Sequence, residues 1–160
     1  MLFYRIGGLI WSILKKWKRK KKKYQFNDFS NETALQLGAK LVQLASSRSN
    51  SVTIDITRAR QQLFHAAMPG TAIDNDQWLK RKINTVYEFG TSSLRCQLDM
   101  EDRDQSLEDA TLLDKHLFAA AGGAFPVNVK KTGFVGTIAV SGLASEEDHQ
   151  LIIDCLEEFL

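Results

Sequence analysis

The sequence has few of the residues that mark catalytic or metal centres. Its two cysteines, Cys96 and Cys155, lie far apart with no CxxC spacing. Such a pair suggests neither a disulfide framework nor a zinc knuckle, and it fits a reducing compartment. Ser92 and Ser93 have no histidine and acid near them in the sequence that would suggest an activated nucleophile. We therefore assign no catalytic residue and no metal ligand, and we expect a binding or interaction domain rather than an enzyme.

A long hydrophobic run is also missing. Residues 1–14 are apolar apart from Arg5 and Ser12, but a membrane-spanning helix needs roughly 20 apolar residues. A secretory signal places its charge before the apolar run and a small-residue cleavage site after it. Neither feature is present here. The sequence thus predicts neither a spanning helix nor a secretory signal at this end.

Acidic residues are absent from residues 1–23, which contain nine of the 21 Lys and Arg residues. Eight of the nine lie between Lys15 and Lys23, directly after an apolar stripe at helical spacing. This combination is typical of a helix that lies on an anionic membrane surface. An unstructured basic leader, or a misassigned start codon, explains the same segment equally well. The first alternative predicts a cytoplasmic protein held peripherally at the membrane.

The remaining chain, residues 24–160, has the opposite charge. Its 12 basic residues face 19 acidic ones, which gives a formal charge of about −7. A nucleic-acid-binding protein usually spreads basic residues over its folded surface. Nucleic acid is therefore excluded as a partner, and residues 24–160 are expected to form one compact domain.

Periodicity in the first half of this domain predicts two helices and a hairpin between them. Ser30 or Asn31 can cap a helix that runs to about Ser47. Two strands follow, over residues 52–57 and 61–68. The next helix takes its N-cap oxygens from residues 74–76, and Gly90 ends it.

The second half begins less clearly. Residues 96–103 predict at most a short strand in an exposed connection, and a helix is expected from Ser106 to the alanine run before Gly122 and Gly123. Strands over residues 124–129 and 134–140 form a second hairpin, and Ser145 caps the final helix. Hairpins separated by helices favour an α+β fold with an antiparallel sheet and helices packed on it.

Four segments carry a family resemblance: LFHAAMPGT at 63–71, DNDQWLKRK at 74–82, GGAFPV at 122–127, and VGTIAVSGL at 135–143, with Asp-His downstream at 148–149. In combination they resemble the haem-degrading-domain (GlcG/HbpS-like) family, and within it an uncharacterised UPF-type branch. The resemblance covers essentially residues 24–160. It implies a profilin-like or PAS-like sheet flanked by helices, a homo-oligomer, and haem binding or degradation.

The sequence departs from the family pattern at two places. Relatives tend to have Asn-Gly in the first hairpin turn, the favoured type I′ pair, whereas Ala59 and Arg60 occupy it here. We therefore expect a different turn. Relatives also often place a histidine just before Gly122, where this chain has Ala121. A histidine that might contact the ligand is missing, so iron ligation would fall to His65 or His149.

The residues we assign to ligand binding share one rationale, a flat apolar surface beside cations and backbone amides. Helical spacing puts Trp78 next to Arg81 and Lys82, and glycines allow a ligand to approach the backbone closely. The cofactor is unknown, with haem possible because it has an apolar ring and two propionates. The predicted ligand-binding residues are His65, Trp78, Arg81, Lys82, Gly122, Gly123 and His149.

Alternatives to each assignment stay open. A strand histidine such as His65 is often structural, His149 can cap its helix or lie exposed, and Gly122 with Gly123 can simply end a helix. Trp78 can pack at a subunit interface while Arg81 and Lys82 pair with acidic residues. The leading interpretation is a small-ligand-binding domain, and the alternative is a non-catalytic oligomeric accessory module that works through protein contacts.

Overall fold

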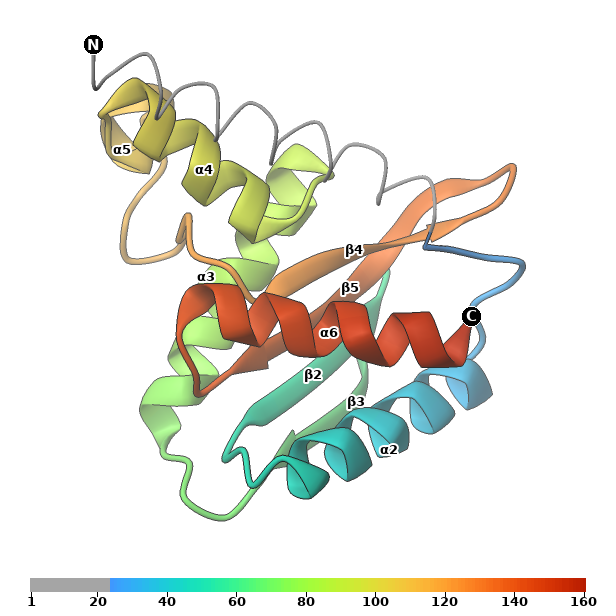
Figure 1. Cartoon of the computed structure of the whole chain (residues 1–160). Coiled ribbons are helices and arrows are strands. Elements are labelled where there is room, and N and C mark those ends of the chain that lie inside the picture. The colour runs from blue at the N-terminus through green and yellow to red at the C-terminus, as the bar shows by residue number, and fades with distance from the viewer. Residues whose placement is uncertain (1–23) are drawn as a thin grey trace, which may run out of the picture.

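The computed structural model describes residues 24–160, which form a five-stranded sheet with helices on both faces (Figure 1). The predicted N-terminal extension, residues 1–23, lies outside the described residues. Among the helices of residues 24–160, none has the length and apolarity needed to cross a membrane. The elements are β1 (Gln25–Phe26), α2 (Asn31–Ser47), β2 (Thr53–Arg58), β3 (Gln61–Ala67), α3 (Ile73–Phe89), α4 (Ser93–Arg103), α5 (Leu107–Thr111), β4 (Ala124–Val129), β5 (Gly133–Ser141) and α6 (Ser145–Phe159).

The strand order is β1-β4-β5-β2-β3. Both predicted hairpins, β2–β3 and β4–β5, are antiparallel, and β5 pairs antiparallel with β2 at the centre. The short β1 adds to β4 in parallel. The predicted α+β class, with an antiparallel sheet flanked by helices, is confirmed.

Alternation along the strands divides the core between the two faces of the sheet. Helices α2 and α6 lie together on one face (Figure 1), where they pack on Ile54, Ile56, Ile138 and Val140. Helix α3 covers the other face, and its Leu79 and Val86 pack on Ala124 and Ala139. The face under α3 is the more polar one. Its buried side chains include Asp55, Thr57 and Thr137 from the strands, and Lys82 and Thr85 from α3.

The β2–β3 turn keeps the backbone of an Asn-Gly turn despite its residues. Ala59 and Arg60 have φ of 47° and 66°, and a type I′ turn requires positive φ at both central positions. The prediction of a different turn was therefore wrong. Tyr87 supports the conformation, because its hydroxyl accepts from the Arg60 amide at 2.8 Å and its ring lies under the Arg60 guanidinium.

The connection between α3 and β4 differs most from the prediction. Residues 96–103, predicted as an exposed connection with at most a short strand, belong to α4, whose N-cap Ser92 accepts from the Arg95 amide at 3.2 Å. The apolar signal is weak because only Leu94 and Cys96 among its hydrophobic residues are buried. Ser106 does cap the next helix, but Leu112 ends it after one turn with φ 62°.

Helix α6 begins one residue from its predicted cap. Its N-cap is Ala144, not Ser145. Acidic side chains from the first turn replace a serine cap, since Glu147 accepts from the Ala144 amide at 3.3 Å and Asp148 from the Leu143 amide at 2.9 Å. The end of α3 was predicted correctly, because Gly90 closes it with φ 61°.

Candidate functional site

A histidine and a buried carboxylate meet across the β2–β3 hairpin. His65 is the register partner of Asp55, and strand alternation directs both side chains to the α3 face, opposite Ile54 and Ile56. The imidazole Nδ1 lies 3.0 Å from the Asp55 carboxylate. Gln62 donates from its side-chain amide to the same carboxylate oxygen. Burial raises the pKa of Asp55 above its ordinary value, while the contacts with Gln62 and His65 lower it.

The other ring nitrogen of His65 contacts a second carboxylate. Nε2 lies 3.1 Å from Asp76, in the first turn of α3. The His65 side chain is 33% exposed, compared with 23% for Asp76 and 7% for Asp55. The histidine is therefore held between an interior carboxylate and one near the surface.

These side chains line a half-open cavity of about 450 Å³ between β3 and α3. Its apolar lining comes from Leu79, Ile83 and Leu117. Its cationic residues are Arg60, Lys80 and Arg81, and His116 also contributes. The cavity thus combines an apolar surface, several cationic side chains and the two carboxylates that hold His65.

Two of these cations are oriented by aromatic rings. The Arg60 guanidinium carbon lies 4.4 Å from the centre of the Tyr87 ring, and that of Arg81 lies 4.4 Å from the centre of the Trp78 ring. Within residues 24–160, neither guanidinium forms an ion pair with a carboxylate. An arginine held in place without a carboxylate partner is suited to bind an anion.

Lys82 is placed differently from its neighbour Arg81. Its side chain is buried, and its ammonium lies 2.9 Å from Asp148 of α6 and 3.2 Å from the Val140 carbonyl oxygen. Burial raises the pKa of Asp148, and Lys82 opposes that shift. The prediction treated Lys82 as a cation offered to a ligand, but its charge is already matched by Asp148.

Gly122 and Gly123 lie next to this ion pair. A side chain at Gly123 would collide with the Val140 carbonyl oxygen and with the Lys82 ammonium. The Gly122 amide, predicted to be free for a ligand, donates to Gln97 at 2.9 Å. The two glycines therefore allow close packing between chain segments.

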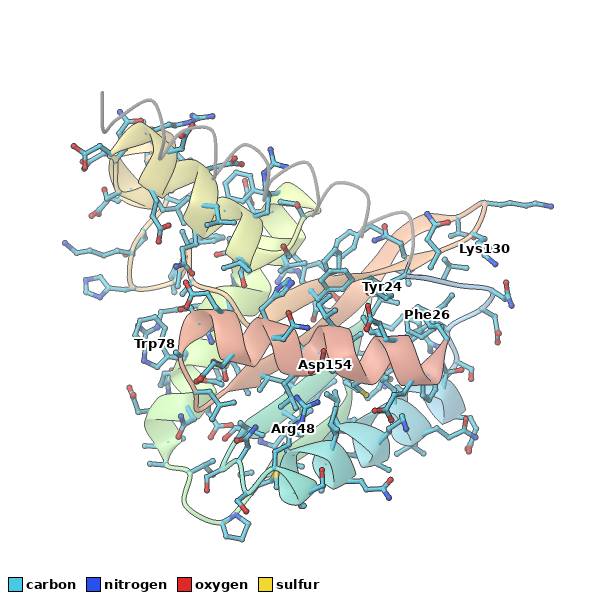
Figure 2. All side chains as sticks on the ribbon, in the orientation of Figure 1. Tyr24, Phe26, Arg48, Trp78, Lys130 and Asp154 are labelled. Atoms are coloured by element: carbon cyan, nitrogen blue, oxygen red, sulfur yellow. The ribbon has the colours of Figure 1, made fainter. Side chains whose placement is uncertain are left out.

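A second hollow, of about 370 Å³, borders this region. It is lined by Trp78, Lys82, Ala121, Asp148 and the chain around Gly142. Arg81 lines the cavity between β3 and α3 instead, so the predicted group of Trp78, Arg81 and Lys82 is divided between two depressions. In Figure 2, Trp78 projects from α3, well away from Arg48 and Asp154, which lie between α2 and α6.

His149 lies on the buried face of α6, in the core. It is fully buried, and its ring meets that of Phe125 edge-on with centroids 5.8 Å apart. It belongs to the lining of neither cavity. Of the two histidines considered for iron ligation, only His65 borders the cavity between β3 and α3. Residues 24–160 contain no group of three or more His, Cys, Asp or Glu residues arranged to hold a metal ion.

Sequence reasoning missed Asp55, Arg60 and His116 as cavity residues. Asp55 reads only as the polar member of an alternating strand, and its partnership with His65 depends on the hairpin register. The sequence marks Arg60 only by its place in the hairpin turn, and gives no sign that its side chain reaches the cavity. His116 has no motif around it, and it comes to the cavity through the irregular chain after α5.

Comparison with known proteins agrees with the family resemblance of the sequence. The family model described as haem degrading protein HbpS-like matches residues 29–157. A UPF0303 protein of Streptomyces coelicolor is 45% identical over 135 residues, which cover 84% of this chain and 85% of that protein. The crystal structure of the Ybr137w protein superposes with a TM-score of 0.85 at 27% identity, covering 91% of this chain and 86% of that one. A complex of PduOC with haem has the same fold, with a TM-score of 0.67 at 17% identity and coverage of 81% and 93%.

Proposed function

The chain belongs to the HbpS-like family of haem degrading proteins, and from this premise we propose that its cavity between β3 and α3 binds a flat anionic ligand, haem or a related tetrapyrrole. The proposal concerns binding. The PduOC structure holds haem on the same fold, which supports a tetrapyrrole as the first ligand to test.

The observation that carries the proposal is the pair of arginines at the cavity. Arg60 and Arg81 come from different elements, each is stacked on an aromatic ring, and neither has a carboxylate partner within residues 24–160. Cations without a carboxylate partner, at a cavity whose wall is partly apolar, favour a ligand that brings its own negative charge. Two carboxylates on one apolar ring meet that requirement.

The residues present fit haem in three respects. Leu79, Ile83 and Leu117 give the ring an apolar surface. The two guanidiniums match two propionates, and His65 supplies an imidazole nitrogen, a ligand that haem iron accepts. When bound, haem would supply a redox-active iron. The protein's own residues would hold the propionates, cover part of the ring and exclude water from it.

The seven predicted ligand-binding residues take different parts in this proposal. His65 and Arg81 contact the ligand, and Trp78 holds the Arg81 guanidinium in place. Lys82, Gly122 and Gly123 support the neighbouring packing, and His149 belongs to the core.

Titration of the full-length protein with ferric haem tests the proposal. We expect a saturable change in the Soret band that Arg60→Ala with Arg81→Ala weakens about tenfold or more, because two charge-assisted contacts are lost. Arg48→Ala with Arg103→Ala is the matched control, since it removes the same charge elsewhere. Arg48 pairs with Asp154 between α2 and α6 (Figure 2).

Equal titrations of both double variants, or only non-saturating association of haem with the wild type, would exclude this site. The oligomeric accessory module would then become the leading interpretation. A homo-oligomer is proposed in either case, and its support is the family to which the chain belongs. Light scattering at micromolar concentration tests the homo-oligomer, and a monomer alone would contradict it.

Residues 1–23 supply a separate proposal, that they hold the protein on an anionic membrane surface. The support is their sequence, in which an apolar stripe precedes eight basic residues. We expect full-length protein to bind anionic vesicles in a salt-sensitive way. Equal binding by a variant without residues 1–23 would contradict the anchor.

A further inference from the structure

The two carboxylates that hold His65 differ in how firmly they are fixed. Asp55 is buried in the strand next to His65 and also accepts from Gln62. Asp76 lies near the surface, and within residues 24–160 its contact with His65 is the one side-chain bond it makes. Of the two contacts, the one at Nε2 is therefore the easier to break.

This difference matters because the two ring nitrogens have different chemical roles. A histidine that binds a metal usually donates its other N–H to a carboxylate, which fixes the tautomer and the orientation of the ring. Asp55 is placed to accept from Nδ1 in that way. Nε2 is then the nitrogen that would bind a metal, and it is directed at Asp76. A hydrogen bond to that carboxylate needs a proton on Nε2, so a metal that binds there would displace this proton.

We propose that Asp76 caps His65 in the ligand-free protein by accepting a hydrogen bond from Nε2. A metalloporphyrin that entered the cavity would displace this contact, with the Nε2 proton released to solvent and the nitrogen lone pair left for the metal. The inference rests on the proposed function, since it assumes a tetrapyrrole in the same cavity. It adds that His65 selects a metal-containing ligand over a metal-free one, and that Asp76 opposes the binding of that ligand.

The exchange requires only local movement. Asp76 is in the first turn of α3, and its side chain can turn towards solvent without disturbing the buried face of the helix, which begins at Leu79. His65 keeps its hydrogen bond to Asp55 throughout. The cavity already borders both side chains, so a ligand inside it would lie beside Nε2.

Full-length protein titrated in parallel with ferric haem and with metal-free protoporphyrin IX tests the exchange. We expect Asp76→Ala to tighten haem binding about fivefold, the factor that one net hydrogen bond of about 1 kcal/mol represents, and to leave protoporphyrin binding unchanged. His65→Ala is expected to weaken haem binding alone. It should also shift the Soret band and the electron paramagnetic resonance spectrum of the ferric complex, because the imidazole nitrogen that would bind the iron is lost.

Asp74→Ala is the matched control. It removes the same charge from the same helical turn, but Asp74 lines the other hollow and does not contact His65. If Asp74→Ala tightened haem binding as much as Asp76→Ala, the effect would be general electrostatics and the cap would be rejected. Urea unfolding of each variant shows whether it folds. Asp76→Ala alters a partly exposed residue, so it keeps the test decisive even if His65→Ala is unstable.

The outcomes separate this inference from the proposed function. Binding of neither porphyrin to the wild type would overturn both. Saturable binding of both porphyrins, with Arg60 and Arg81 needed but with Asp76→Ala and His65→Ala affecting the two ligands alike, would overturn the exchange and leave the proposed function standing.

Discussion

The Lys82 ammonium and the Asp148 carboxylate form an ion pair 2.9 Å long in the interior, joining α3 to α6. The two side chains are 4% and 2% exposed. Asp148 also accepts from the Leu143 amide at the start of α6. A charge withdrawn so far from water needs its partner, so the pair is a condition for stable packing of these helices.

Lys82→Met is expected to lower the free energy of unfolding by about 3–5 kcal/mol, because Asp148 stays buried without its cation. Urea denaturation measures the change. Arg81→Met is the control, since it removes a cation from the adjacent, partly exposed position and should have a much smaller effect. A loss below about 1 kcal/mol for Lys82→Met would contradict the assignment of Asp148 as a buried charge.

A substitution in the β2–β3 turn is expected to stabilise the protein. Ala59 has φ of 47°, a conformation that disfavours residues with a Cβ by roughly 1–2 kcal/mol. Ala59→Gly should therefore raise the free energy of unfolding by about 0.5–1 kcal/mol after the greater entropy of glycine in the unfolded chain is subtracted. Ala66→Gly in β3 has the same entropy effect but relieves no positive φ, so it should destabilise the protein. Destabilisation by both substitutions would show that the turn is not strained.

The sequence predicted most of the sheet because its strands alternate clearly. Ile54 and Ile56 in β2, and Ile138 and Val140 in β5, stand at every second position and all reach the same core. The sequence did not predict helix α4 because its hydrophobic residues show no such regular spacing. Among its hydrophobic residues it buries only Leu94 and Cys96, which is too few to give a periodic signal.

The candidate site was harder to predict because its contacts are long-range. Lys82 stands at the margin of an apolar stripe, and nothing near it in the chain shows that it points inward to Asp148, 66 residues away. Asp55 and His65 are closer in sequence, but only the hairpin register places them opposite each other. Helical spacing did bring Arg81 next to Trp78, since residues three positions apart share a helix face.

Gly38 provides a test of the packing between α2 and β3. A Cβ at this position would overlap the Phe64 ring, so Gly38→Ala should destabilise the protein although alanine favours a helix by about 1 kcal/mol. Phe64→Leu leaves more room beside α2. We expect the double variant Gly38→Ala with Phe64→Leu to be more stable than the sum of the two single changes predicts, as measured in a double-mutant cycle. Strict additivity would mean that the ring moves away at little cost.

The two buried cysteines make the free energy of unfolding depend on pH in the alkaline range. Burial raises the pKa of Cys96 and of Cys155 from 9.0 to about 12. Between these values the unfolded chain loses thiol protons that the folded protein keeps, so the stabilising contribution is complete below pH 9 and is lost as the pH rises towards 12. Raising the pH from 8 to 10 should lower the free energy of unfolding by roughly 1.4 kcal/mol for each thiol.

Urea unfolding at pH 8 and pH 10 checks this prediction, with Cys96→Ala and Cys155→Ala combined as the comparison. The double variant is expected to be less stable at both pH values, because Cys155 is fully buried in the main core and its replacement leaves a small cavity. Its loss of stability between pH 8 and pH 10 should nevertheless be smaller than that of the wild type by roughly 3 kcal/mol, the contribution of two thiols. Lysine and tyrosine residues titrate in both proteins and cancel in the comparison. An equal pH dependence in the two proteins would mean that the thiols ionise as readily in the folded chain as in the unfolded one.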